Sequence, residues 1–594
     1  MTDKLHPLVT AAGREMADGK LDRREFLRVA TLLGVGAGAA YSMAGLSEPA
    51  MAQGAPRKGG TLRLGMRVQD LSSPHTYSWI EATNVARQTV EYLTYTGVDN
   101  VTRPGLVEKW EASPDLKSWK ISLRRDAKWR KGGRPFNADD AIWNMKRMLD
   151  PATGSSTVGL LRAFILENFE LDEIDPRTQK KRVSFRLWDS NAFRKIDDFT
   201  FEINGKSSFL GIPEAMFHYP AHMLDPAEGG KFGVGSNGTG AFELVELEVG
   251  KRAVLTARKD GYWGGGPWLD RIEVIDLGDD SAAQVAALAS RQVDMIYQGA
   301  IAALPAAERL PHVQINSVDT AYTAVARVQP VKPFDDKRVR QALRHATDTE
   351  AVLKVAHRGL GKPGEHHHVA KVHPEYADVG FMRRDVAKAK ALLAEAGYPN
   401  GIDTEIACRP QPDWELLAVQ TMVEQWKEAG IRVKINVMPS AQYWDVWTKV
   451  PFGFTTWAHR PLGVMVLGLA YRSGAAWNES NWSNKEFDAL LAEAEGYLDV
   501  ERRRAVVAKL EQIMLDDGPA VVPLWRALFN YFGQEGEGVQ DPPHRLHRVQ
   551  GSLDRRLIRD ARRRRRGPTA RGGGTLRAER SRGRAWRDIS SASR

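Results

Sequence analysis

Cysteine is almost absent from this chain, since its 594 residues include only Cys408. One thiol forms neither an intrachain disulfide nor a cysteine-based metal site. A chain with so few thiols is compatible with an oxidising compartment. The sequence also lacks G-x-S-x-G, H-E-x-x-H and the Walker A motif, so acyl-transfer, zincin and NTPase chemistry have no support. We expect no enzyme activity and no cofactor, with a hydrolase kept as a remote alternative.

The excess of positive charge is confined to the C-terminus. Residues 539–594 hold 17 of the 84 basic and five of the 74 acidic residues, and none of the 17 is lysine. The rest of the chain is therefore near neutral, and no nucleic-acid partner is expected for it. The tail lacks apolar periodicity, which predicts an Arg-rich disordered segment. A frameshift product and a basic tail for nucleic acid or anionic lipid are alternatives.

Long apolar runs are missing except near the N-terminus. There, Arg23 and Arg24 precede an apolar, glycine-interrupted run over residues 29–46, and Ala50-Met51-Ala52 follows. A charged region, an apolar region and an A-x-A site form a secretory signal, and the paired arginines indicate the twin-arginine type. We therefore predict a twin-arginine signal peptide over residues 1–52 and a periplasmic location. A retained membrane anchor is the alternative.

The region most suggestive of a binding site is residues 452–482, which is aromatic and poor in charge. Neither a period of two nor a period of 3.6 persists across it. Aromatic rings with a few polar groups are what a small-molecule pocket requires. Ordinary core with loops is the alternative interpretation. The rings in this stretch belong to Phe452, Phe454, Trp457, Tyr471, Trp477 and Trp482.

Elsewhere the pattern is that of an α/β protein. Predicted helices alternate with predicted strands beyond residue 384, as in a wound α/β lobe. Asn137 is expected to cap a helix with Asp140 at its third position. The G-x-G-x-x-G match at residues 233–238 follows no strand and opens no helix, so it predicts turns rather than a dinucleotide site. Other predicted helices cover residues 81–93, 281–290, 349–357, 385–396, 414–429, 484–495 and 500–515, and predicted strands cover 61–66, 119–124, 321–327, 404–408 and 433–437.

Several ordered blocks resemble one family over residues 58–535. The chain is similar to the periplasmic solute-binding proteins of peptide, nickel and opine ABC importers, also termed extracellular solute-binding protein family 5. The blocks that carry the resemblance are Pro104-Gly105-Leu106-Val107-Glu108-Lys109-Trp110, Leu123-Arg124-Arg125-Asp126, Phe136-Asn137-Ala138-Asp139-Asp140, Gly238-Thr239-Gly240-Ala241-Phe242, Gly261-Tyr262-Trp263-Gly264 and Phe334 to Leu343.

The resemblance implies a two-lobed α/β periplasmic binding protein of type II, cluster C-like, with an α+β subdomain inserted in the first lobe at about residues 95–215. It places lobe I at residues 53–319, lobe II at 320–519 and a return to lobe I at 520–538. The family implies capture of a peptide, opine or amino-acid-derived solute between closing lobes. Its partners would be an ABC permease with its ATPase, and the twin-arginine translocase during export. We expect a monomer.

In the peptide-binding members an Asp after the Trp of the second lobe holds the ligand's ammonium group. Here Trp457 is followed by His459 and Arg460 and by no acid. Because guanidinium holds carboxylates in a bidentate fork, we expect a ligand with an anionic group. Further predicted ligand-binding residues, each with an alternative role in packing or in solvent, are Tyr77, Trp79, Arg409, Tyr471 and Trp477.

A histidine-rich loop supports one alternative, a nickel or metal-chelate binding protein of the same importer class. His366, His367 and His368 are weak candidates as metal ligands, with His373 nearby. Adjacent histidines on a loop without a fixed scaffold are more simply a polar surface. We therefore predict no metal site.

Overall fold

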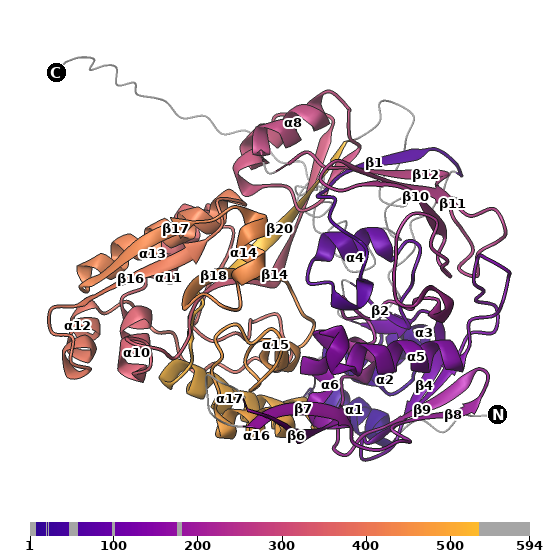
Figure 1. Ribbon diagram of the computed structural model, residues 1–594, viewed down its shortest axis with the longest axis horizontal. Helices are drawn as coiled ribbons and strands as arrows, with labels where there is room; N and C mark the ends of the chain where they lie inside the picture. Colours follow the sequence, from indigo (N-terminus) through magenta and orange to yellow (C-terminus); the bar gives the residue numbers. More distant parts are fainter. Residues whose placement is uncertain are drawn as a thin grey trace, which may run out of the picture. The chain divides into compact units, whose positions relative to one another are not determined.

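A computed structural model describes residues 7–19, 21, 23–46, 58–97, 101–174, 181–278 and 280–533 (Figure 1). The predicted tail of residues 539–594 and the predicted cleavage point after residue 52 lie outside the described residues.

The main feature of the described chain is a 12-stranded sheet with strand order β10-β11-β12-β1-β13-β20-β14-β18-β16-β17, in which β15 pairs with β20 and β19 pairs with β14. β1 runs parallel to β12 and β13, and β16 runs parallel to β17 and β18. The strands are β1 (Thr61–Gly65), β10 (Phe242–Glu248), β11 (Arg252–Ala257), β12 (Arg271–Ile275), β13 (Met295–Ile296), β14 (Val313–Val328), β15 (Gly361–Pro363), β16 (Ile402–Cys408), β17 (Ile431–Val437), β18 (Phe452–Trp457), β19 (Ala520–Val521) and β20 (Leu524–Gly533).

Two long strands join the halves of this sheet. β14 pairs antiparallel with β20 through its first half and with β18 through its second half. Its register with β20 shifts between Asp319 and Tyr322, where a bulge bends and twists a strand. β14 and β20 thus pass from the lobe of β1 and β10–β13, here lobe I, to the lobe of β16–β18, here lobe II (Figure 1).

Helices of lobe II follow the predicted βα alternation. β16 is followed by α13 and then by the parallel strand β17, because a parallel pair needs a crossover connection. Buried Trp414, Met422 and Trp426 place one face of α13 in the core. The helices are α10 (Lys337–His345), α11 (Thr349–His357), α12 (Val386–Glu395), α13 (Asp413–Glu428), α14 (Ser440–Val446), α15 (Gly463–Ala470), α16 (Lys485–Glu495) and α17 (Val500–Asp516).

A second, smaller α+β region lies between β1 and β10 in the sequence. Its sheet has the order β4-β5-β9-β8, and β2-β3 and β6-β7 form separate hairpins. The elements are β2 (Thr94–Thr96), β3 (Thr102–Pro104), β4 (Val107–Ala112), β5 (Ser118–Leu123), β6 (Leu166–Ile174), β7 (Lys181–Leu187), β8 (Phe193–Asp197), β9 (Thr200–Asn204), α5 (Ala138–Leu149), α6 (Thr157–Ile165) and α7 (Ile212–Ala215).

Residues at the N-terminus of α5 determine where this helix begins. The Asn137 side chain accepts a hydrogen bond from the Asp140 backbone, and the Asp140 carboxylate accepts one from the Asn137 backbone. This reciprocal capping box was predicted from the sequence. The G-x-G-x-x-G match at residues 233–238 opens no helix, as also predicted.

One predicted helix is too long. Residues 81–93 were expected to be helical, but α4 (Ile80–Ala86) ends earlier. The carbonyl groups of Gln88 and Thr89 instead accept hydrogen bonds from Phe242 and Gly240. A tertiary contact therefore overrides the local helical preference. The remaining helices of lobe I are α8 (Ser281–Ala289) and α9 (Leu304–Ala307).

The N-terminal residues form three helices against the largest hydrophobic core: α1 (Pro7–Ala17), α2 (Arg23–Leu32) and α3 (Ala37–Met43). Phe26 and Ala30 are fully buried there. In the described part of the chain, no helix has the length and apolar character needed to span a bilayer.

Candidate ligand-binding site

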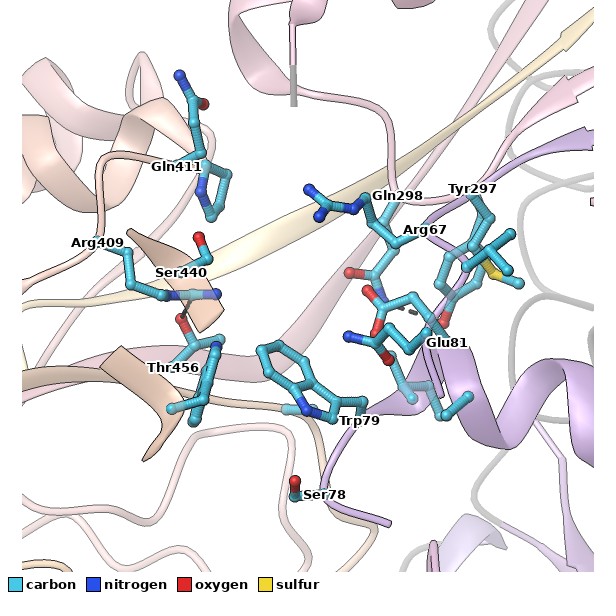
Figure 2. Close-up of a pocket in the computed structure, with 18 of the residues that line it drawn as sticks. Arg67, Ser78, Trp79, Glu81, Tyr297, Gln298, Arg409, Gln411, Ser440 and Thr456 are labelled. Carbon is cyan, nitrogen blue, oxygen red and sulfur yellow. Dashed lines mark hydrogen bonds between the residues drawn. The ribbon is translucent and has the colours of Figure 1, made fainter. Parts of the chain in front are cut away.

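A cavity of about 670 Å³ lies between the two lobes (Figure 2). Residues 65–82 and 297–302 line it from lobe I, and residues 409–414, 440–447 and 456–460 line it from lobe II. This volume falls within the range of small-molecule sites, on the order of 300–1,000 Å³. The cavity therefore has the size and the interlobe position expected of a ligand site.

Four tryptophans of lobe II form one wall of the cavity, here called the tryptophan wall: Trp444, Trp447, Trp457 and Trp477. Their ring centroids are 5.6–6.5 Å apart along the series, in edge-to-face contact. Trp79 of lobe I meets Trp444 with a centroid distance of 4.3 Å. Such edge-to-face pairs are favourable for aromatic rings. The wall offers an apolar, planar surface to a ligand.

A buried carboxylate fixes the orientation of Trp457. The indole Nε1 of Trp457 donates to Glu479 Oε1 at 2.8 Å. Glu479 also accepts from Arg327 Nε at 2.7 Å and from the Thr455 hydroxyl. Because Glu479 is only 3% exposed and fully engaged by donors, it holds the ring and presents no negative charge to the cavity.

Arg460 is buried at the edge of the tryptophan wall. Its guanidinium lies 4.4 Å from the Tyr219 ring centroid and 5.9 Å from that of Trp477. Nη1 donates to two backbone carbonyl groups of its own turn, while Nε is buried without a hydrogen-bond partner. No ion pair joins Arg460 to a carboxylate among the described residues. A buried cation of this kind is an available anion binder.

Arg409 and Arg526 supply two more guanidinium groups to the cavity. Arg409 pairs with buried Glu415 at 2.5 Å, donates to Thr456 Oγ1 and stacks on Trp444 at 4.9 Å. Arg526 lies between the rings of Tyr322 and Trp414, at 4.7 and 5.0 Å. Burial lowers the pKa of Arg526. Glu415 is the ion-pair partner of Arg409, and Asp413 and Asp445 also line this side of the cavity, so both signs of charge are present there.

The lobe I wall is chemically different. Figure 2 shows Glu81, Arg67, Tyr297 and Gln298 together on the side opposite Arg409, with Trp79 between the two groups. Arg67 Nε lies 3.4 Å from the Asp276 carboxylate. Gln298 has φ 49°, and the Asn530 side chain accepts from its backbone N–H at 2.9 Å. A non-glycine residue in this left-handed conformation is uncommon and is a feature of ligand sites.

Six of the eight ligand-binding residues predicted from the sequence line the cavity: Tyr77, Trp79, Arg409, Trp457, Arg460 and Trp477. Tyr77 lines the cavity, and its hydroxyl donates a hydrogen bond to Leu71 O at 2.7 Å.

His459 and Tyr471 do not line the cavity. His459 Nδ1 accepts from the Ala321 backbone on β14 at 3.1 Å. Tyr471 pairs through its hydroxyl with His368 Nδ1 at 2.9 Å. Both side chains therefore hold backbone and core in place.

The histidine loop is not a polar surface, so that interpretation was wrong. His366, His367 and His368 are at most 1% exposed, and burial lowers the pKa of each to about 3. The loop folds inward against Tyr471 and the buried Glu511 of α17. Within the described residues, no group of three or more His, Cys, Asp or Glu side chains could hold a metal ion.

The sequence did not reveal several cavity residues, because they come from distant segments. Trp414 and Tyr322 resembled core residues of a helix and a strand, and Arg526 lies in β20. Only the aromatic stretch that contains Trp457 and Trp477 indicated a pocket from residues close together in the sequence. The lining residues not predicted from the sequence include Arg67, Glu81, Tyr219, Tyr297, Tyr322, Trp414, Trp444, Trp447 and Arg526.

Comparison with known proteins finds relatives that match most of this chain. The chain is 28% identical over 446 residues to heme-binding protein A of Haemophilus influenzae, covering 70% of this chain and 77% of the relative. It is 25% identical over 480 residues to the dipeptide-binding protein of Escherichia coli, covering 75% and 85%. Among solved structures, AgaA from A.tumefacien R10 in complex with agropinic acid matches with TM-score 0.70 and 21% identity, covering 83% of this chain and 97% of that one.

These structural matches confirm the predicted two-lobed α/β fold. The model of "Bacterial extracellular solute-binding proteins, family 5 Middle" matches residues 101–469, which is more than half of the chain. The chain therefore belongs to the bacterial extracellular solute-binding proteins, family 5, the substrate-binding components of ABC importers.

Proposed function

We propose that this protein captures a small solute with an anionic group in the cavity between its lobes and delivers it to the permease and ATPase of an ABC importer. The observation that carries the proposal is Arg460, buried beside the tryptophan wall without a carboxylate partner among the described residues. A carboxylate on the ligand would supply the missing charge and accept a bidentate pair of hydrogen bonds.

The chemistry of the two walls narrows the ligand class further. Lobe II offers indole rings, guanidinium groups and the carboxylates of Asp413 and Asp445, and lobe I offers tyrosine rings with Glu81, Asp70 and Arg67. An opine or another amino-acid-derived compound combines a carboxylate with groups that Glu81 can bind. We propose binding rather than catalysis as the function of the cavity, with lobe closure by bending at the bulge between Asp319 and Tyr322.

A thermal-shift screen of the purified protein tests this proposal, because a ligand of the native state raises the melting temperature. The panel contains N-carboxyalkyl amino acids, free dipeptides, a neutral sugar and nickel with histidine. We expect the N-carboxyalkyl amino acids to give the largest shift. A shift confined to nickel with histidine would favour the metal-chelate alternative, and one confined to the sugar would refute the anionic ligand.

We also propose export to the periplasm by the twin-arginine route, supported by Arg23, Arg24 and the apolar run that follows them. Cell fractionation tests the route. The Arg23→Lys/Arg24→Lys double variant should stay in the cytoplasm, whereas the conservative Arg14→Lys control, on α1, should still be exported. Export of the double variant at the wild-type level would refute it.

A further inference from the structure

The charged side chains that line the cavity differ in burial according to their sign. Three of its arginines are at most 6% exposed: Arg409, Arg460 and Arg526. The acidic side chains that line it are all at least partly exposed: Asp70, Glu81, Asp413 and Asp445. Because solvent and salt screen an exposed charge far more than a buried one, the buried charges that face the cavity are those of guanidinium groups.

The protein neutralises one of these three arginines. Both oxygens of the Glu415 carboxylate accept hydrogen bonds from Arg409, at 2.5 and 3.2 Å, and the Thr456 hydroxyl donates to the same carboxylate. Glu415 also attracts the guanidinium of Arg526, but one carboxylate offsets only one of the two positive charges. In the described part of the chain, no ion pair joins Arg526 to a carboxylate. Its buried charge therefore lacks a full counter-charge.

Arg526 has the same kind of surroundings as Arg460. Each guanidinium lies over the rings of one tyrosine and one tryptophan: Tyr322 and Trp414 at 4.7 and 5.0 Å for Arg526, and Tyr219 and Trp477 at 4.4 and 5.9 Å for Arg460. The Nε of each guanidinium is buried without a hydrogen-bond partner among the described residues. Burial raises the pKa of both tyrosines, so these partners are neutral. The cavity therefore contains two similar sites for an anion.

The two arginines lie on opposite sides of β14. On one side, Thr320 Oγ1 donates to the carbonyl oxygen of Arg526 at 2.8 Å. On the other side, the Ala321 N–H donates to His459, the residue before Arg460, at 3.1 Å. Two strand spacings, roughly 10 Å, therefore separate the two backbone segments. Since both arginines line one cavity, a single small ligand can contact both.

An acidic side chain lies near both arginine sites. Burial is the main cause of the raised pKa of Tyr219 and of Tyr322, and the charge of Glu81 raises each of them further. Glu81 lines the cavity from lobe I (Figure 2). A cationic group in the middle of a ligand that contacts both arginines would therefore have an acid close to it.

We propose that Arg526 is a second anion binder of the cavity and that the ligand is a dicarboxylate, with one carboxylate at Arg460 and the other at Arg526. This inference rests on the proposed anionic ligand and specifies its class. A carboxylate accepts a planar, bidentate pair of hydrogen bonds from a guanidinium, and it supplies the counter-charge that the protein leaves out at Arg526. An N-carboxyalkyl amino acid, with a protonated secondary amine between two carboxylates, has the order of charges that Arg460, Glu81 and Arg526 would bind.

The test is a set of calorimetric titrations that pairs each arginine with each carboxylate of one ligand, as in a double-mutant cycle. The probe is N-(1-carboxyethyl)phenylalanine, and each of its two monoamides lacks one of the carboxylates. The proteins are the wild type, Arg460→Met, Arg526→Met and the matched control Arg432→Met, which replaces an exposed arginine paired with Asp403. Circular dichroism verifies that each protein is folded.

The wild type and Arg432→Met should bind the diacid equally well. Arg526→Met should weaken binding of the diacid about tenfold or more, because one carboxylate loses its partner. The monoamide without that carboxylate should bind Arg526→Met within about twofold of the wild type, which also verifies an intact cavity, whereas Arg460→Met should still weaken its binding. The other monoamide should show the reverse pattern. Arg526→Lys, which keeps the charge but not the planar fork, should give the same pattern with smaller changes.

The outcomes separate this inference from the proposed function. Diacid binding by Arg526→Met within about twofold of the wild type, with a clear loss in Arg460→Met, would refute the second anion binder and leave the single anionic group standing. Sensitivity of both variants to the same carboxylate would also refute it, because one anion would then bind both arginines. Equal diacid binding by all four proteins, or a wild type that binds neither the diacid nor a monoamide, would refute both proposals.

Discussion

Two buried arginines show how the same side chain serves different purposes. Arg503, on α17, is fully buried and donates to Glu25 and to the carbonyl groups of Tyr497 and Leu498. Arg460, beside the cavity, is 5% exposed and has aromatic rings and backbone carbonyl groups around it but no carboxylate among the described residues.

The difference indicates where charge is satisfied internally and where it is left for a ligand. A buried ion pair such as Arg503 with Glu25 is a structural unit, and removing one member leaves the other uncompensated. Arg460 is a buried cation that is flanked by rings and faces a cavity. Because its removal leaves no buried carboxylate uncompensated, it should affect binding more than folding.

Arg503→Met should destabilise the protein by about 3–5 kcal/mol, because it leaves the buried Glu25 with only Arg28 as a partner. Urea denaturation of the full chain measures the change. Arg460→Met is the matched control, with an expected loss below about 1 kcal/mol, since no buried carboxylate loses its partner. Equal losses in the two variants would remove the distinction between a structural and a ligand-binding arginine.

Arg460→Met should weaken binding of a carboxylate ligand by about 2–5 kcal/mol, because the ligand's charge would be buried without a partner. Arg460→Lys should recover part of the affinity, since an ammonium keeps the charge but loses the planar fork. Calorimetric titration with the best ligand of the thermal-shift screen measures both. Arg432→Gln, an exposed position paired with Asp403, is the control and should bind normally.

The buried contact between Arg28 and Glu214 should show a pH dependence that the cavity does not. Burial raises the pKa of Glu214 to about 7, even though Arg28 counteracts it. A carboxyl group whose folded pKa is raised contributes stability below its unfolded value of about 4.5 and loses it as pH rises through about 7.

The wild-type protein should therefore lose more stability between pH 5 and pH 8 than Glu214→Gln, by on the order of 1 kcal/mol or more. Denaturation at the two pH values measures the difference. Arg460→Met should follow the wild-type profile. Parallel profiles for the wild-type protein and Glu214→Gln would contradict the assigned pKa.

Trp477→Leu should lower the affinity for the ligand by about 0.5–2 kcal/mol, because it removes one ring next to the Arg460 guanidinium. The wild-type and variant proteins are compared by the same titration. Val437→Leu, exposed at the end of β17, is the control. A tighter-binding Trp477→Leu variant would show that the ring fills the site rather than supporting it.

Locally encoded features could be predicted from the sequence. The capping box of Asn137 and Asp140 and the helix over residues 349–357 depend on residues within one or two turns, and both appear in the structure. The end of α4 could not be predicted, because it depends on hydrogen bonds from Gly240 and Phe242, more than 150 residues away. The burial of His366–His368 likewise depends on Tyr471 and α17.

Some residues of the candidate site could likewise be predicted from the sequence, and others could not. Trp457, Arg460 and Trp477 lie close in sequence, and their composition alone suggested a pocket. Trp444 and Arg526 join them only through the sheet order, in which β20, β14 and β18 are neighbours. The N-terminal segment was predicted as an export signal, with a membrane anchor as the alternative, because its apolar run gives no indication that α17 and β4 carry contact groups for it.

The central claim is that Arg460 makes this cavity a site for an anionic group. Its most direct test is calorimetric titration of the wild-type protein with a matched pair of ligands, an N-carboxyalkyl amino acid and the same compound with its carboxylates amidated. We expect saturable binding of the first and at least about a hundredfold weaker binding of the second. Tight binding of a plain dipeptide that requires its free N-terminal amine, with no penalty for amidation, would contradict it.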